Sequence, residues 1–198
     1  MDITSRGKTV SNSYTVNILD FGGVPDGTTD NASALQNALN SIQNTGGTVV
    51  IPDGVWKFTS SVTMTQTAQS NMVRITGTGN TSIKIAFPSY DGTYGWTFTN
   101  VWHLILENMN FIRTSASSHD KVFAYVRVTG TDTHMVEIKN IITKGTFPVY
   151  SIFRIEDAQE VFVYNCQFLG TAMFNTTTTL GVFLLINTHL TVFEQNMF

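Results

Sequence analysis

Charged side chains are scarce in this chain of 198 residues, because Asp, Glu, Lys and Arg together make up only 13% of it, about half the usual share of globular domains. The 11 Lys and Arg residues are spread thinly, and the net charge is −3. Proteins that bind nucleic acid gather basic residues on one face, so we expect no nucleic-acid partner. The polar surface must instead come from Thr, Ser and Asn, which favour strands and turns.

Cysteine and long apolar runs are also nearly absent. The single cysteine, Cys166, excludes an intramolecular disulfide, and its position in the apolar stretch VFVYNCQFLG predicts a buried, unreactive thiol. No apolar run approaches the roughly 20 residues of a membrane-spanning helix. Residues 1–15 lack the apolar core of a signal peptide. We therefore expect neither membrane insertion nor a signal peptide.

The spacings that hold metals and nucleotides are missing too. The four histidines do not have the separations of metal ligands. The stretch GTGNTSIK contains one Gly-x-Gly, but it lacks the third glycine and the helix of a dinucleotide site. We expect no metal and no cofactor.

One helix is predicted, close to the start of the chain. Leu35, Ala38, Leu39 and Ile42 fall at helical spacing and form one apolar stripe, and the glycine pair at 46–47 is a stop signal. The sequence therefore predicts a helix over about residues 30–45. After it, apolar residues alternate with a period of two between Gly, Asn and Thr, which is typical of short strands.

Three later segments align without gaps and share the pattern apolar, any, apolar, polar, Asn, apolar. They are LILENMNF (104–111), VEIKNIIT (136–143) and VFVYNCQF (161–168), with LTVFEQNMF (190–198) as a looser fourth copy. Such repeats indicate a solenoid with one coil per repeat. A βαβ fold would need helices between the strands, and a β-sandwich would need more two-residue hairpin turns. We predict an all-β parallel β-helix of about six or seven coils.

The shared asparagines, Asn108, Asn140 and Asn165, are expected at tight bends between strands. Asparagine tolerates the left-handed conformation, and stacked amides can bond to one another along the axis. The alternative is that the three asparagines occupy unrelated turns, where this residue is common.

The two ends of such a stack expose the edges of strands above an apolar core, and an exposed edge promotes aggregation. The helix at about 30–45 is therefore expected to cap the first coil. The chain stops inside a coil pattern at NMF, so we expect it to continue in a longer protein or to be covered by other subunits. The expected organisation is an extension over 1–15 and a single domain over 16–198.

The stretch VNILDFGGVPDGTTDNASALQNALNSI, followed by GGTVVIPDGVWKF, resembles the N-terminal signature of the pectate-lyase-like superfamily. That superfamily includes polygalacturonase-type glycosidases and many bacteriophage tailspikes. The resemblance is close over residues 16–87 and implies a right-handed parallel β-helix. The NTD, DD, GHG and RIK motifs of the polygalacturonases are absent. The pectate lyases need a calcium-binding acidic cluster with a nearby arginine, and none of the arginines in the coil region lies in a recognisable motif of that family. No catalytic residue can therefore be transferred from the family.

Candidates for chemistry come from the residues alone. Glycoside hydrolysis needs two carboxylates about 5–9.5 Å apart, and neighbouring coils bring Glu137 close in register to Glu156 or Asp157. The simpler alternative is that these are solvated surface residues.

Aromatic residues are candidates for sugar binding, because their rings stack on the apolar faces of sugars. The candidates are Trp96, Trp102, Tyr125 and Tyr150. The alternative is that several of them fill the interior of the coils.

The first functional hypothesis is a phage tailspike or tail appendage with a structural and adhesive role, which binds cell-surface polysaccharide on the host. It implies a homotrimer, contacts with other tail proteins, and a place in the virion tail or outside the cell. The second hypothesis is a polysaccharide-degrading enzyme, either a lyase or a glycoside hydrolase. The third is a β-helical scaffold that only spaces other domains.

Overall fold

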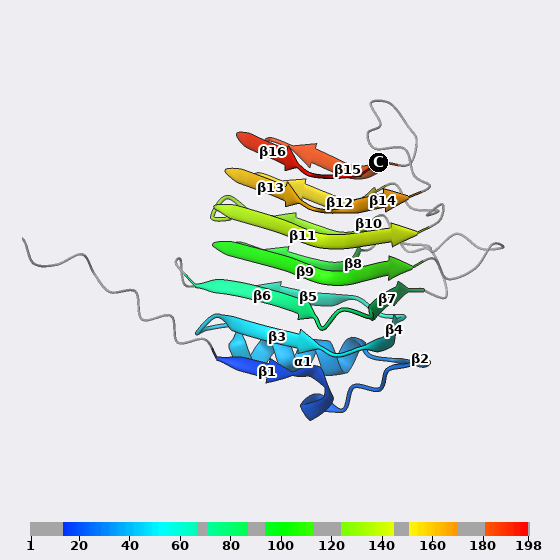
Figure 1. Cartoon of the computed structure of the whole chain (residues 1–198). Coiled ribbons are helices and arrows are strands. Elements are labelled where there is room, and N and C mark those ends of the chain that lie inside the picture. Colours follow the sequence, from blue (N-terminus) through cyan, green and yellow to red (C-terminus); the bar gives the residue numbers. More distant parts are fainter. Residues whose placement is uncertain are drawn as a thin grey trace, which may run out of the picture.

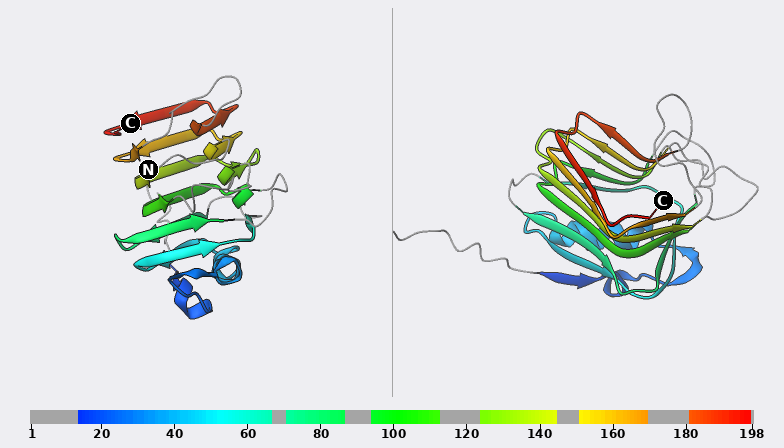
Figure 2. Two further views of the ribbon diagram at one scale, coloured as in Figure 1. Left: turned by 90° about the vertical axis from the view of Figure 1, so that its right-hand side faces the viewer. Right: turned by 45° about the horizontal axis from the view of Figure 1, so that its top comes forward.

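The computed structural model describes residues 14–66, 71–86, 94–112, 124–144, 151–169 and 181–197. The chain winds into a right-handed parallel β-helix with one α-helix at the N-terminal end of the stack (Figure 1). Three strand columns, here called the first, second and third faces, surround one core, and the strand pairs described in all three are parallel (Figure 2). This confirms the predicted fold class.

The first face is followed along the chain by the second. The first face contains β1 (Thr15–Asn17), β3 (Gly47–Ile51), β6 (Met72–Gly77), the first halves of β9 (His103–Ile112) and β11 (Met135–Lys144), β13 (Glu160–Tyr164) and β16 (Leu190–Glu194). The second face contains β2 (Asp26–Asp30), β4 (Gly54–Phe58), β7 (Thr81–Ile85), the second halves of β9 and β11, and β14 (Gln167–Leu169).

The third face is a separate sheet of five strands. It contains β5 (Val62–Thr65), β8 (Tyr94–Thr99), β10 (Ala124–Thr129), β12 (Ser151–Glu156) and β15 (Gly181–Ile186). Each of these strands completes one coil, so the structure has about five full turns built from strands alone, where the sequence predicted six or seven coils. A first coil with a helix on its third side precedes them, and β16 begins a further one.

The first coil contains the 3₁₀ helix η1 (Ile18–Phe21) and the helix α1 (Ala32–Ile42). Helix α1 is shorter than predicted and buries the expected apolar stripe. It follows β2 at the place where later coils have a strand of the third face, and it packs against η1, β3 and β5. Figure 1 shows it at the N-terminal end of the stack, the position that the capping hypothesis requires.

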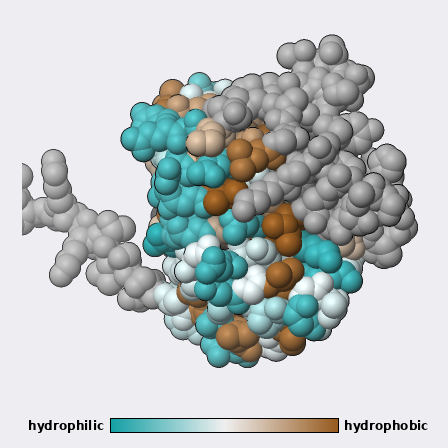
Figure 3. Space-filling view, turned by 45° about the vertical axis from the view of Figure 1, so that its right-hand side comes forward, coloured by the Kyte–Doolittle hydropathy of each residue, from teal (hydrophilic) through white to brown (hydrophobic). Residues whose placement is uncertain are grey.

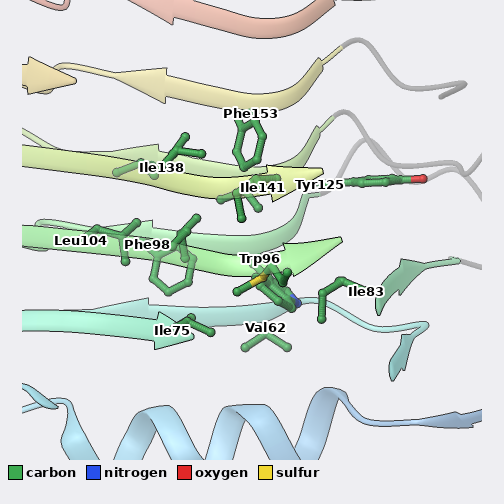
Figure 4. Packing of buried hydrophobic residues seen from close by; sticks show 14 of the residues in the cluster. Val62, Ile75, Ile83, Trp96, Phe98, Leu104, Tyr125, Ile138, Ile141 and Phe153 are labelled. Carbon is green, nitrogen blue, oxygen red and sulfur yellow. The ribbon is translucent and has the colours of Figure 1, made fainter. Parts of the chain in front are cut away.

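The core is a column of large apolar side chains from the three faces (Figure 4). Trp96 packs edge-on against Phe58, with ring centroids 5.2 Å apart, and also contacts Phe111. Phe153 continues the column above Phe111. Cys166 is buried as expected, and burial raises the pKa of its thiol to about 11.

The asparagine ladder predicted from the repeats is present at the corner between the first and second faces. Asn108, Asn140 and Asn165 have φ of 58°, 51° and 49°. The Nδ2 of Asn140 donates to the Oδ1 of Asn108, and the Nδ2 of Asn165 donates to the Oδ1 of Asn140, both at 2.8 Å. Gln195 occupies the same position in the fourth copy, with φ 53°. Unrelated turns are thereby excluded.

A second series of left-handed residues lies at the corner between the third and first faces, and the sequence did not reveal it. Asn100, Asp157 and Asn187 have φ of 54°, 62° and 52°, and Gly130 has φ 107°. The Nδ2 of Asn187 donates to the Oδ1 of Asp157 at 3.1 Å. Asp157 therefore has a structural role at this corner.

Candidate functional site

The outer surface of the third face carries the most concentrated group of charges that this sheet shows in the described residues. In β12, Phe153 and Ile155 point into the core, so Arg154 and Glu156 point outward. Arg127 of β10 lies beside Arg154 in the strand register. Parallel pairing at about 4.8 Å thus places two guanidinium groups and one carboxylate together.

Glu156 binds both arginines. Its Oε2 accepts from the Nε of Arg127 at 2.6 Å, and its Oε1 accepts from the Nε of Arg154 at 2.7 Å and from Nη2 of the same residue. Burial of the Glu156 side chain disfavours its charged form, but the hydrogen bonds and the two positive charges outweigh burial, so the pKa of the carboxyl lies below its usual value. Glu156 is therefore ionised at neutral pH.

The ring of Tyr94 lies against both arginines. The Cζ of Arg127 is 4.7 Å from the ring centroid, and the Cζ of Arg154 is 6.0 Å from it. Guanidinium groups at these distances are attracted to the face of the ring. Tyr94 therefore helps to hold the planes of the two guanidinium groups in place. We call Tyr94, Arg127, Arg154 and Glu156 the arginine cluster.

Arg127 in the arginine cluster has hydrogen-bond donors that its pairing with Glu156 does not use. Arg127 bonds to Glu156 through Nε, and in the described part of the chain its two Nη groups make no hydrogen bond. Thr97 lies beside Arg127 in the register, and Thr63 lies beside Thr97. The surface therefore combines guanidinium donors, which suit carboxylates and phosphates, with a row of hydroxyl groups.

The carboxylates that the sequence singled out are not brought together. Glu137 projects from the first face, where its Oε1 is 2.5 Å from the Nε2 of His103 and its Oε2 is 2.6 Å from the Nζ of Lys139. Glu156 projects from the third face, and Asp157 lies at the corner. Because Glu137 and Glu156 point outward from different sheets around the same core, they cannot flank one glycosidic bond.

The aromatic residues proposed for sugar binding differ in burial. Trp96 and Tyr125 are fully buried, which corrects their assignment as surface platforms, because both fill the interior of the coils. Trp102 is partly exposed and packs against the ring of His134, with centroids 4.7 Å apart. Tyr150 lies outside the described residues.

Sequence reasoning missed the pairing of Arg127 with Arg154 and the role of Tyr94. One signal was available, since positions 127 and 154 are 27 residues apart, close to the intervals between the repeated asparagines. Residues separated by one coil lie side by side in a solenoid. In the described ranges, no three His, Cys, Asp or Glu side chains are grouped so that they could hold a metal ion, and no helix there is long and apolar enough to cross a membrane.

Comparison with solved structures gives two similar folds. A protein of Geobacillus virus E2, ORF18, matches with a TM-score of 0.53 and 19% identity, over 92% of this chain and 48% of that protein. A putative glycosyl hydrolase from Parabacteroides merdae matches with a TM-score of 0.48 and 13% identity, over 92% of this chain and 97% of that protein. The chain thus spans about half the length of the virus protein.

Comparison with protein families gives a match over nearly the whole chain. No curated protein matches the sequence. The model of the family described as rhamnogalacturonase A/epimerase, pectate lyase-like, matches residues 15–194, which include all the described strands and the arginine cluster. With its parallel β-helix, the chain belongs to this pectate-lyase-like family.

Proposed function

We propose that this protein binds an acidic polysaccharide through the arginine cluster on the third face. One observation carries the proposal: Arg127 and Arg154 both bind the ionised carboxylate of Glu156 on the outer surface of this sheet. The two Nη groups of Arg127 make no hydrogen bond in the described ranges and remain available to a ligand. A carboxylate on a sugar is a fitting partner, because arginine binds carboxylates through paired hydrogen bonds.

The biological setting that we propose is a virion tail appendage that attaches to polysaccharide on the surface of the host cell. The family description supports a role connected with polysaccharide, and the shared fold with a Geobacillus virus protein supports a place in a virus particle. The proposal includes assembly as a homotrimer together with other tail proteins. A sedimentation mass of three protomers of 21.9 kDa each would support the trimer, and a monomeric mass at micromolar concentration would contradict it.

The cluster is better suited to binding than to turnover. A general acid must be protonated near neutral pH, and a general base must have a free lone pair directed at the substrate. Glu156 has a lowered pKa, and both of its oxygens already accept hydrogen bonds from arginine. We therefore favour adhesion over a lyase or hydrolase at this site.

The test measures binding of a polygalacturonate hexasaccharide by calorimetry, for the wild type and for Arg127→Gln. We expect Arg127→Gln to weaken binding about tenfold, because it removes a charge-assisted contact. Arg74→Gln is the matched control, since Arg74 also pairs with a largely buried glutamate, Glu107, but on the first face. Equal loss in the two variants would overturn the assignment of the site.

The same mixtures are assayed for reducing ends and for unsaturated products. Binding without product supports adhesion. If the wild type releases product and Glu156→Gln does not, the protein is an enzyme at this site, and adhesion alone is contradicted.

A further inference from the structure

A hollow of about 510 Å³ lies on the outer side of the corner between the first and second faces, away from the arginine cluster. The turn from Gly77 to Gly79 lines one end, and Asn165 and Gln167 line it three coils further along the axis. Figure 3 views the molecule from the side on which the second face lies, where hydrophilic and hydrophobic residues are interspersed. The hollow is therefore elongated along the stack.

The lining repeats from coil to coil. One row is the ladder of Asn108, Asn140 and Asn165. A second row lies two residues further along each coil, where Ile142 pairs in register with Asn110 on one side and with Gln167 on the other. None of the described residues that line the hollow carries a charge. The two rows thus present amides, with an apolar contact at Ile142, at the strand spacing of about 4.8 Å.

The amides have unused capacity for hydrogen bonds. An amide group has two N–H donors and two acceptor sites on its oxygen. Asn140 donates one hydrogen bond and accepts one within the ladder, so one donor and one acceptor site remain. The side chains of Asn110 and Gln167 make no hydrogen bond in the ranges that the structure describes.

The glycine turn fixes one end of the hollow close to the ladder. A Cβ on Gly77 would lie 2.1 Å from the backbone oxygen of Asn108, so only glycine permits this approach. Gly79 has φ 128° and nothing within 4 Å of the position of a Cβ. The two glycines therefore add no side chain to the hollow, and the hydroxyl of Thr78 between them donates to Asp53.

We propose that this hollow is a second glycan-binding site, which takes an uncharged stretch of polysaccharide lying parallel to the axis of the stack. Sugar hydroxyls both donate and accept hydrogen bonds, which matches amides better than charged groups would. The apolar C–H faces of the sugars pack on Ile142, which lines the hollow and is partly exposed. The inference rests on the proposed function in that the ligand is a polysaccharide, but it concerns a different face and a different sugar chemistry.

The test uses maltohexaose, cellohexaose and mannohexaose as neutral probes, with the full chain, in a calorimetric titration. At least one probe is expected to bind, and the double variant Asn110→Ala/Gln167→Ala is expected to weaken that binding about tenfold. Gln159→Ala is the matched control, because Gln159 is an exposed amide outside the hollow. Gln167→Ala alone, at an exposed position, should keep the fold and weaken binding about threefold.

The inference is overturned if none of the three probes binds, or if the double variant binds as tightly as the Gln159→Ala control. Its outcome is separable from that of the proposed function. Arg127→Gln should leave binding of the neutral probe unchanged, and the double variant should leave binding of the polygalacturonate hexasaccharide unchanged. If Arg127→Gln weakened both ligands equally, one shared site would replace two.

Discussion

At the scale of single residues, backbone conformation decides where each coil turns. The left-handed region costs a residue with a Cβ roughly 1–2 kcal/mol, and asparagine offsets this cost through its side-chain hydrogen bonds. Asn140 is the middle member of the ladder and bonds to Asn108 on one side and Asn165 on the other. Both contributions are lost when the amide is removed.

Asn140→Ala is therefore expected to lower the free energy of unfolding by about 2–4 kcal/mol, from conformational strain and two lost hydrogen bonds. Asn140→Gly separates the two causes, because glycine adopts φ of 51° without strain and should lose about half as much. Urea denaturation followed by circular dichroism measures both. Equal losses in the two variants would show that backbone conformation contributes nothing.

Glu156 makes stability depend on pH in a defined direction. The pKa of its carboxyl is lower in the folded protein than in the unfolded chain, where it is about 4.5. The contribution of Glu156 to the free energy of unfolding is therefore complete above the unfolded-state pKa, and it is lost as the pH falls through the folded-state pKa. The measurement is the difference in free energy of unfolding between the wild type and Glu156→Gln. This difference should be constant over roughly pH 6 to 8 and should shrink below about pH 4.5. A difference that grew on acidification would contradict the ionised state of Glu156.

The sequence predicted one of the two series of left-handed corner residues, and the reason for missing the other is physical. At the ladder corner the same residue type recurs, since each amide bonds to the next. At the other corner the positions are filled by Asn100, Gly130, Asp157 and Asn187. Each of these residue types tolerates positive φ, so different residues adopt the same left-handed conformation and no repeated residue marks this corner in the sequence.

At the scale of elements, helix α1 and the strands above it share one core. Leu39 is fully buried at the end of the stack, whereas Asn37 of the same helix is exposed. The sequence predicted this helix from its apolar stripe but placed its start near residue 30. Asp30 is instead the last residue of β2, and its carboxylate accepts hydrogen bonds both from the backbone N–H of Ala32, where the helix begins, and from the backbone of Thr59 in the next coil.

Leu39→Ala is expected to lower the free energy of unfolding by about 2–5 kcal/mol, because it leaves a cavity in the core. Asn37→Ala should change it by less than about 0.5 kcal/mol. Thermal unfolding followed by both near- and far-ultraviolet circular dichroism measures the effect. If the strands melted at the wild-type temperature in Leu39→Ala, the helix would not stabilise the stack.

The third face also shows why the sequence did not separate buried aromatic residues from exposed ones. Tyr125 and Val126 are both buried although they are neighbours, and so are Gly95 and Trp96. Two successive residues in each strand therefore face the core, although the register between β8 and β10 does not shift there. Such a break in the alternation changes which side chains face the core, and a period-two pattern does not reveal it.

At the scale of the whole molecule, the stack separates different chemistries onto different surfaces. The first face carries ion pairs that neutralise one another, such as Arg74 with Glu107 and Lys139 with Glu137. The third face carries the arginine cluster, with two guanidinium groups for one carboxylate. The corner between the first and second faces presents neutral amides. One short repeat therefore supplies two distinct proposed sites for polysaccharide.

The central claim is that the third face recognises the carboxylate of an acidic sugar. The most direct measurement is a calorimetric comparison of a polygalacturonate hexasaccharide with the same oligosaccharide after its carboxyl groups have been reduced to alcohols. The acidic form is expected to bind about tenfold or more tightly, and this preference should disappear in Arg127→Gln. Equal affinity of the wild type for both forms would contradict it.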